Sequence, residues 1–393
     1  MKEIHSDINI VGGGLIGSIT ALCLSKLGFE VTILEKKPKF NSKNHKDQRT
    51  IAISEGTKIF FDKIGLWNEM KPLCQFIEKI KVVDRELSNQ LEFDNVRRKS
   101  NLGYIIKNID LLNFIYLKIK KNRNIKIINN IRIKDIQFDN EKIIICSEVI
   151  KVISDLNIAA DGKFSTVRKI FKTPYYSKNY KKNALVLTFT HSKDHKSTAF
   201  EFFYKNGPLA ILPMKKTTNN FSSSIVWTHN TEYLEFLIEL ENKKLKAILN
   251  EKTQGCVGSI EKIISKQMFP LSAHLNTRFF EKRTVYIGDS AHSFHPIAGQ
   301  GWNLGINDLN NLYEIIKKYK SLGIEVGNQS FCKEYQNKNF YNSYTLYQVT
   351  DKLDSIFKLQ NPVIEKLRFF CISNINNFKK LKNKISDFAM RVN

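Results

Sequence analysis

Two short apolar runs flank one helical pattern at the start of the chain. Residues 7–11 (Asp-Ile-Asn-Ile-Val) and 30–34 (Glu-Val-Thr-Ile-Leu) have the length and β-branched content of buried strands. Between them, Ser18 to Leu27 carries apolar residues at helical spacing, and Gly28 stands where a helix C-cap is expected. The pattern therefore predicts a strand–helix–strand unit.

The same periodicities divide the rest of the chain. Helical spacing recurs in three regions, namely 109–119, 231–250 and, interrupted at Pro362, from about Ile306 to the C-terminus. Alternation predicts an antiparallel sheet from 79–93 and 184–227. Three shorter runs predict a small meander ahead of a strand at 158–160, and they lie at 125–130, 131–138 and 142–146.

Composition fits a globular enzyme. A length of 393 residues favours two to three domains, and the chain is 42% hydrophobic and 11% aromatic. Six cysteines are scattered without a C-x-x-C pair, which indicates reduced thiols and excludes a disulfide framework or a zinc site. Because the first strand begins by residue 7, we expect no signal or transit peptide, and no run of 18 apolar residues is present. We expect a cytoplasmic protein.

The net charge of +24 has two interpretations. Lysine is frequent throughout, so the charge can be compositional. Residues 355–393, however, carry eight Lys or Arg and two acidic residues, with an apolar stripe from Ile364 to Phe388 at helical spacing. Such a helix either packs on the core with a solvated basic face or docks peripherally on the inner face of a membrane. Nucleic-acid-binding motifs are absent from the sequence, so nucleic acid is not an expected partner.

A glycine-rich turn follows the first strand. Gly12, Gly14 and Gly17 stand in the G-x-G-x-x-G frame between the strand and the helix, and Glu35 ends the second strand. The glycines permit a tight turn and close approach of a pyrophosphate to the helix N-terminus, while the acid can accept ribose hydroxyls. This unit predicts dinucleotide binding without distinguishing FAD from NAD.

A second glycine-rich segment lies between a strand-like run at 284–287 and the C-terminal helices. Gly288 and Asp289 follow the strand, and the loop continues through Pro296 and Gly299 to Gly301. The acid can bind a ribityl or ribose hydroxyl. The backbone can approach a flat ring closely, and the helix start offers free N–H groups to an anionic edge. The segment predicts a flavin-sized ligand.

A third block, 158–168, is a strand that ends in Asp161-Gly162 with Ser165 and Arg168 at fixed offsets. With these three blocks in this order, the chain resembles the aromatic-hydroxylase class (class A) of FAD-dependent monooxygenases. More narrowly, it resembles the ubiquinone-biosynthesis hydroxylase family. Further segments similar to that family are 47–54, 207–214, 225–228 and 269–271. The resemblance covers roughly residues 5–390. It departs at Ser290, where Ala is commoner, and at Trp302, where a smaller residue is expected.

The resemblance implies an α/β fold with a Rossmann-like FAD-binding domain, an inserted antiparallel-sheet substrate domain and C-terminal helices. Its implied boundaries are 1–75, 102–174 and 268–320 for the first, 76–101 and 175–267 for the second, and 321–393 for the helices. It also implies that Asp161 and Gly162 contact the cofactor and that Arg49 lies on its phosphate side. Pro296, Gly299, Gln300 and Gly301 would surround the flavin ring, with backbone N–H groups up to Asn303 as donors.

The implied reaction needs no protein nucleophile. NADH or NADPH binds transiently and reduces FAD, oxygen gives a C4a-hydroperoxide, and one oxygen atom passes to the aromatic ring of a polyprenylated phenol or quinone precursor. Other quinone-biosynthesis proteins are expected partners. Two alternatives stay open, a flavin-dependent reductase of isoprenoid chains and a non-catalytic flavoprotein subunit of a quinone-synthesis complex.

Several residues allow a second interpretation. Asp289, His292 and His295 have a spacing that a metal site could use, but they lie in the loop assigned to flavin, so we expect no metal. His292 is either a general base or, as we favour, a structural histidine. Asp161 and Arg168 could simply form an ion pair, and Arg49 could be a surface cation.

Overall fold

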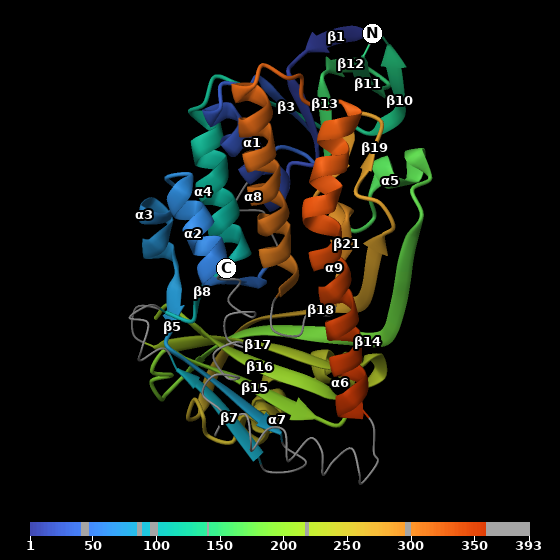
Figure 1. Cartoon of the computed structure of the whole chain (residues 1–393). Helices are drawn as coiled ribbons and strands as arrows, with labels where there is room; N and C mark the ends of the chain where they lie inside the picture. Colours follow the sequence, from blue (N-terminus) through green and yellow to red (C-terminus); the bar gives the residue numbers. More distant parts are fainter. Residues whose placement is uncertain are drawn as a thin grey trace.

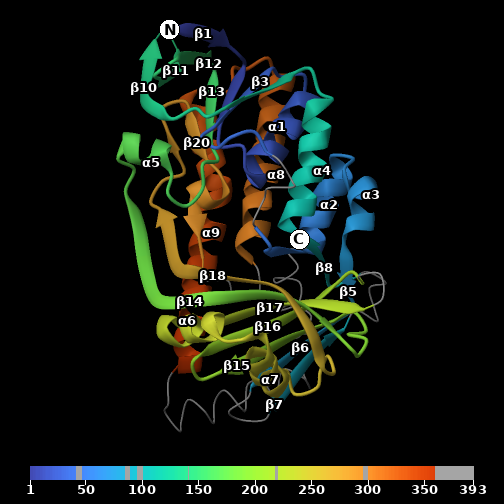
Figure 2. The ribbon, with the colours of Figure 1, turned by 180° about the vertical axis from the view of Figure 1, so that it is seen from behind.

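The computed structural model describes residues 1–40, 47–84, 89–94, 101–139, 141–216, 220–294 and 300–358. A helix-flanked part containing a parallel sheet stands on one face of a large sheet, and the long helix α9 (Gln329–Lys358) runs alongside both (Figures 1 and 2). The combination confirms the predicted mixed α/β class.

A six-stranded sheet has the order β19-β20-β13-β2-β3-β9. Its strands are β2 (Ile8–Val11), β3 (Val31–Glu35), β9 (Ile125–Asn129), β13 (Leu156–Ala159), β19 (Phe280–Glu281) and β20 (Thr284–Tyr286). All neighbours pair in parallel except β19 with β20. The predicted strand–helix–strand unit is confirmed, since α1 (Leu15–Lys26) connects β2 to β3 and Gly28 follows with φ +82°.

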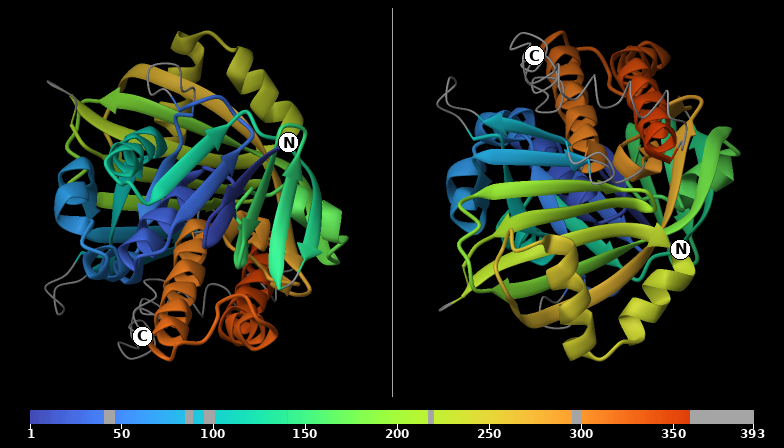
Figure 3. Two further views of the ribbon diagram at one scale, coloured as in Figure 1. Left: turned by 90° about the horizontal axis from the view of Figure 1, so that it is seen from above. Right: turned by 90° about the horizontal axis from the view of Figure 1, so that it is seen from below.

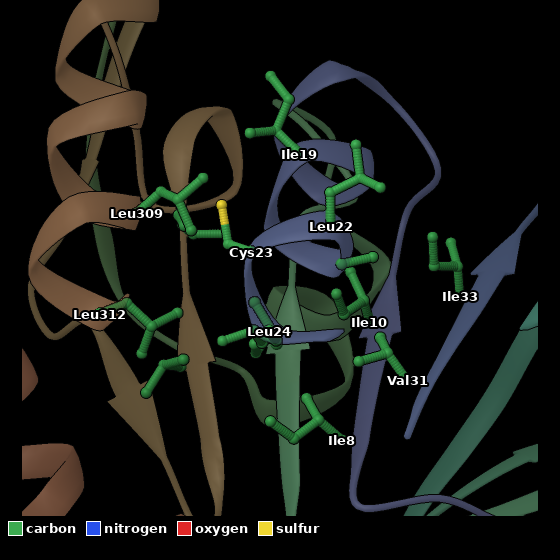
Figure 4. Packing of buried hydrophobic residues seen from close by; sticks show 14 of the residues in the cluster. Ile8, Ile10, Ile19, Leu22, Cys23, Leu24, Val31, Ile33, Leu309 and Leu312 are labelled. Carbon is green, nitrogen blue, oxygen red and sulfur yellow. The ribbon is translucent and has the colours of Figure 1, made fainter. Parts of the chain in front are cut away.

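Helices α1, α4 (Asn108–Lys120) and α8 (Gln300–Ser321) pack on this sheet. Side chains from β2, β3, α1 and α8 interdigitate in the core between them (Figure 4). The central strands are buried on both faces, because strands β11 and β12 also pack against β13 and β2, in addition to the helices. This is why residues 8–11 and 31–34 read as continuous apolar runs rather than as alternating ones.

The predicted meander is wrong in its membership. Strand β9 leaves it and pairs in parallel with β3, because it returns from helix α4 as the second strand of a crossover unit. The meander instead consists of β10 (Ile133–Asp139), β11 (Lys142–Ser147) and β12 (Ile150–Ser154). It is completed by β1 (Lys2–His5), an unpredicted strand that pairs in parallel with β12.

A three-stranded sheet, β4-β8-β5, lies between the parallel sheet and the large one. Its strands are β4 (Thr50–Ile53), β5 (Gln75–Ile77) and β8 (Gly103–Lys107). The connection from β4 to β5 forms α2 (Glu55–Lys63), α3 (Trp67–Met70) and η2 (Lys71–Leu73). Ser54 caps α2 by accepting from the Thr57 backbone N–H.

The large sheet has eight strands in the order β21-β18-β14-β17-β16-β15-β6-β7. They are β6 (Lys79–Asp84), β7 (Asn89–Asp94), β14 (Tyr175–His191), β15 (Thr198–Tyr204), β16 (Gly207–Met214), β17 (Phe221–Asn230), β18 (Ile260–Asn276) and β21 (His292–Ser293). Pairing is antiparallel except between β6 and β15. The expected boundary at 268 falls inside β18, which continues through it.

Helices α6 (Thr231–Glu239) and α7 (Asn242–Thr253) cover one face of this sheet, where Leu234 and Leu249 join its core (Figure 3). The opposite face, here called the inner face, is turned toward the three-stranded sheet. On the inner face Ala199 and Met214 pack with Ile105 of β8. Within the described part of the chain, no helix has both the length and the apolar content required to cross a bilayer.

Candidate functional site

The turn after β2 is built from three glycines with different surroundings. Gly12 has φ +109°, and a Cβ there would lie 2.3 Å from the Ala160 carbonyl oxygen of the neighbouring strand. A Cβ on Gly17 would lie 2.0 Å from the Gly12 carbonyl oxygen. At Gly14 a Cβ would meet nothing within 4 Å. Gly12 and Gly17 thus permit backbone packing, whereas Gly14 leaves open space at the N-terminus of α1.

Glu35 ends β3 beside this turn. Its carboxylate accepts hydrogen bonds from the Gly13 N–H (2.6 Å) and the Lys37 N–H (2.8 Å). Tyr116 of α4, which no sequence pattern indicated, donates its hydroxyl hydrogen to the Gly13 carbonyl (3.1 Å). Burial, reinforced by the charge of Glu35, raises the pKa of Tyr116 to about 12, so the phenol stays a donor. These contacts fix the glycine turn against the end of β3.

Gly288 and Asp289 follow β20 as part of η3 (Gly288–Ser290), at the same edge of the parallel sheet. The Asp289 side chain is solvent-accessible, yet surrounding protein desolvates its carboxyl and raises its pKa. His292, Arg49 and Lys163 act in the opposite direction. An accessible carboxyl group encircled by protein and cations is suited to hydroxyl groups of a bound ligand.

A buried histidine–carboxyl contact holds the Gly288 turn in place. His292 Nε2 lies 2.6 Å from Asp308 Oδ2 on helix α8, and both side chains are inaccessible to solvent. The same carboxylate oxygen accepts from the Gly288 N–H (3.1 Å). This supports the structural interpretation of His292 over the general base. Asp308 was not singled out in the sequence, although it interrupts the buried stripe of α8 between Leu304 and Leu312.

The Asp161-Gly162 turn follows β13, between the two glycine segments. Asp161 Oδ2 accepts from the Thr166 and Val167 N–H groups (2.6 and 3.2 Å) and so caps helix α5 (Thr166–Phe171). Burial raises the Asp161 pKa, and its Oδ1 is a buried acceptor without a partner among the described atoms. Gly162 has φ +80° and open space where a Cβ would be. A hydroxyl donor on a ligand would satisfy Oδ1.

Arg168 connects this turn to the Gly288 turn. Its guanidinium donates to the Ser290 carbonyl (3.1 Å) and contacts His274 Nε2 (3.0 Å). Desolvation, with Arg168 next in effect, lowers the pKa of His274 to about 3, so His274 is the neutral partner. The structure does not contain the alternative, a direct Asp161–Arg168 ion pair; the arginine instead joins the Asp161-Gly162 turn to the Gly288 turn.

Helix α8 begins at Gln300, next to these turns. The Asn303 side chain donates to the Ala52 carbonyl (2.8 Å) and accepts from the Ser54 N–H (2.9 Å) and the Thr57 hydroxyl (2.8 Å). The side chain is therefore committed to joining α8 to β4 and α2. Gly301 has open space at its Cβ position. The expected Pro296 and Gly299, together with His295, lie outside the described residues.

Trp302 follows Gly301 in the first turn of α8. Its indole stacks on Phe61 of α2, with ring centroids 6.1 Å apart. It packs against the core cluster of the parallel sheet. The larger side chain at this position is therefore accommodated by α2.

Arg49 lies just before β4. It forms two hydrogen bonds with Asp47 (2.9 and 2.7 Å), and its guanidinium lies 4.9 Å from the centroid of the Phe269 ring on β18. Although desolvation opposes it, pairing with Arg49 lowers the pKa of Asp47 to about 2. The interaction of Arg49 with Asp289 places a permanent cation beside the Gly288 turn.

The turns after β2, β3, β13 and β20 thus meet at one edge of the parallel sheet, where ligands of open α/β sheets bind. Three carboxyl groups lie at this edge, those of Glu35, Asp161 and Asp289, and carboxyl groups can accept hydrogen bonds from hydroxyl groups. The start of helix α8 completes the arrangement, together with three glycines that have open space beside them, Gly14, Gly162 and Gly301. The arrangement fits a long ligand with two ribose-like parts and a central anionic part.

Comparison with known proteins identifies the fold and the family. The family described as FAD binding domain matches residues 5–321. The ubiquinone hydroxylase UbiM of Neisseria meningitidis is 28% identical, over 98% of this chain and 84% of that protein. The 3-demethoxyubiquinol 3-hydroxylase of Escherichia coli is 24% identical, over 99% of this chain and 100% of that protein.

Solved structures share the whole architecture. The p-nitrophenol 4-monooxygenase PnpA of Pseudomonas putida has a TM-score of 0.80 at 16% identity, covering 99% of this chain and 98% of that one. PqsL of Pseudomonas aeruginosa, in complex with 2-aminobenzoylacetate, has a TM-score of 0.77 at 18% identity, covering 94% and 100%. At these identities the likeness shows the fold alone.

Proposed function

The chain belongs to the FAD binding domain family, and from this premise we propose that it is an FAD-dependent monooxygenase that hydroxylates the aromatic ring of a polyprenylated phenol on the route to ubiquinone. The observation that carries the proposal is the similarity to ubiquinone hydroxylases along nearly the entire chain, which includes the large sheet as well as the cofactor site. NADH or NADPH is the proposed reductant.

The residues present fit FAD. Glu35 would hold the adenosine ribose, the N-terminus of α1 beside Gly14 the pyrophosphate, and Asp289 the ribityl chain. Arg49 supplies a cation near that chain. The unpartnered buried Oδ1 of Asp161 and the open space at Gly162 and Gly301 are features that a bound cofactor would fill.

Bound FAD would supply the redox chemistry, including activation of oxygen. The chain's own residues bind and orient the cofactor and the phenol and exclude water from the space between them. Backbone N–H groups in the first turn of α8 can stabilise negative charge on the edge of the ring that faces them. Arg168 and the His292–Asp308 pair position the turns without touching the reacting atoms.

The proposal can be tested by expressing the protein in bacterial strains that each lack one ubiquinone-ring hydroxylase. The strains are grown under labelled oxygen. We expect labelled ubiquinone in at least one strain by mass spectrometry, because a monooxygenase transfers one atom of molecular oxygen to its substrate. The rescued strain would identify the ring carbon. If no strain gains label while the purified protein is yellow with FAD, the quinone substrate is wrong, and unlabelled saturated prenyl chains would favour a reductase.

We also propose that residues 355–393, which lie almost wholly beyond the described chain, attach the enzyme peripherally to the membrane that holds its polyprenylated substrate. Their excess of basic residues and their apolar stripe support this. Full-length protein should float with vesicles containing anionic lipid and much less with neutral vesicles. Exchange of Lys379, Lys380, Lys382 and Lys384 for Glu should abolish flotation, whereas exchange of four lysines outside this segment should not. Equal flotation of both variants would contradict the proposal.

A further inference from the structure

Strand β15 presents two different faces. Phe202 is buried in the core beneath α6 and α7, and Phe200 and Tyr204 pack against the same core. Because side chains alternate along a strand, Ala199 and Glu201 project from the other side, the inner face. Ala199 confirms this assignment, since it packs with Ile77, Leu102 and Ile105 of the neighbouring sheet. Glu201 is therefore an acidic residue on the inner face.

Glu201 is the acidic member of an otherwise neutral row across the sheet. Its pairing partners are Val82 on β6 and Ala210 on β16. Following the register outward gives the remaining members of the row, which are Leu91, Val226, Val186 and Gln267. The neighbours of Glu201 on both sides are thus apolar, and Ala210 is too small to cover it.

This row faces the cofactor side. At one end, Gln267 accepts a hydrogen bond from the Gln48 backbone N–H (3.1 Å). Near the other end, Ala52 packs among the residues around Ala199, and its carbonyl is held by Asn303 at the start of α8. Residues 48–52 therefore extend across the inner face from β18 toward β15. Glu201 lies on that same face, two residues along β15 from Ala199, which packs in the cluster that includes Ala52.

Within the described residues, the Glu201 side chain makes no hydrogen bond and no ion pair, and the residue is only half-exposed. Desolvation raises the pKa of its carboxyl to about 7. Among the described side chains, the other titratable group that the register places on the inner face near it is Asp84 on β6. Across the interface, Asp47 and Arg49 pair with each other over β18. A desolvated carboxyl group without a partner is costly, unless a ligand supplies a donor.

We propose that Glu201 receives the phenolic hydroxyl of the substrate and accepts its proton. The inference rests on the proposed function and adds a substrate-contacting residue to it. In the step, the O–H bond of the phenol breaks and an O–H bond forms on Glu201, while the electron pair stays on the phenolic oxygen. The resulting phenolate donates electron density into the ring, which favours attack by an electrophilic oxygen at the ortho and para carbons. Glu201 returns the proton to the phenolic oxygen when the hydroxylated product leaves.

Binding of a phenol and of its methyl ether tests the proposal without turnover. The probes are ortho-geranyl phenol and its methyl ether, and dissociation constants are measured by equilibrium dialysis on oxidised, FAD-loaded, full-length enzyme. At pH 8 the native enzyme should bind the phenol about tenfold to a hundredfold more tightly, because only the phenol can donate to an ionised carboxylate. At pH 6 this preference should shrink, since a group with a raised pKa of about 7 is then protonated.

Glu201→Gln keeps the shape of the side chain and a neutral acceptor but cannot ionise. Its preference for the phenol over the methyl ether should therefore be only a few-fold and independent of pH. Glu201→Asp should retain the pH dependence with weaker binding, which covers the case in which the amide variant does not fold. Glu239→Gln is the matched control, because it removes an exposed carboxyl from α6 on the opposite face and should behave like the native enzyme.

The outcomes distinguish a wrong role for Glu201 from a wrong substrate class. An unchanged, pH-dependent preference in folded, yellow Glu201→Gln would overturn the role of Glu201 and leave the proposed function standing. If the native enzyme binds neither probe, the phenol substrate itself is wrong. A preference that falls equally in the Gln and Asp variants, with no pH dependence in either, would make Glu201 a packing residue and likewise overturn the proposal.

Discussion

Exchange of Gly17 for alanine is expected to abolish FAD retention and to lower the free energy of unfolding by about 3 kcal/mol or more. The added methyl group would lie 2.0 Å from the Gly12 carbonyl oxygen and 3.2 Å from the Ala160 side chain. Alanine is favoured over glycine inside a helix by about 1 kcal/mol, so propensity alone predicts the opposite sign. The clash outweighs it, because a backbone oxygen in a tight turn cannot move aside.

Gly14→Ala is the matched control in the same turn. Its Cβ would meet no atom within 4 Å, and its backbone at φ −69° and ψ −174° suits any residue. We expect the unfolding free energy to change by no more than about 1 kcal/mol, the range for an N-cap exchange. FAD should nevertheless bind less tightly, because the methyl group enters the space at the helix N-terminus proposed for the pyrophosphate.

Urea unfolding of the two apoproteins and titration with FAD measure these effects. If Gly17→Ala loses stability, Gly17 is required for backbone packing. If Gly14→Ala keeps near-native stability but binds FAD more weakly, Gly14 is required for access of the cofactor. If Gly14→Ala bound FAD as tightly as the native chain, the pyrophosphate would not lie beside Gly14, and the position assigned to it from the turn would be wrong.

The parts of the site that were predictable are those whose backbone constrains the sequence. Gly12 and Gly17 are required by contacts between main-chain atoms, and Gly288 lies at φ +59° against Ile16, so these positions leave a pattern that can be read directly. Apolar runs likewise predicted β2 and β3, because strands buried on both faces tolerate few polar residues.

What could not be predicted depends on long-range pairing. Strand β9 has the same local pattern whether it joins a meander or the parallel sheet, and only the crossover through α4 decides. Tyr116 contacts Gly13 from 103 residues away, and Asp308 contacts His292 from another element, so the local sequence reveals neither contact. Of the two residues, only Asp308 has a signal in the sequence, because it is an acidic residue on the apolar stripe of a helix.

Asp308→Ala is expected to destabilise the fold by about 3 kcal/mol, because each buried polar group left without its hydrogen-bond partner costs roughly 1–3 kcal/mol. The substitution would leave the buried His292 ring and the Gly288 N–H without their acceptor. Since the Gly288 turn carries Asp289, the contact proposed between Asp289 and the ribityl chain should be misplaced, and FAD affinity should fall at least tenfold even at temperatures where the variant is folded.

Asp308→Asn and Asn307→Ala distinguish this network from a general loss of helix stability. The amide keeps an acceptor for Gly288 but loses the charge toward His292, so it should be intermediate in unfolding free energy and in FAD affinity. Asn307 is half-buried one position earlier in α8, and its truncation should change both by little. If Asp308→Ala loses stability but binds FAD normally when folded, the pair supports the helix alone, and the position of Asp289 must be set by the Arg168–Ser290 contact instead.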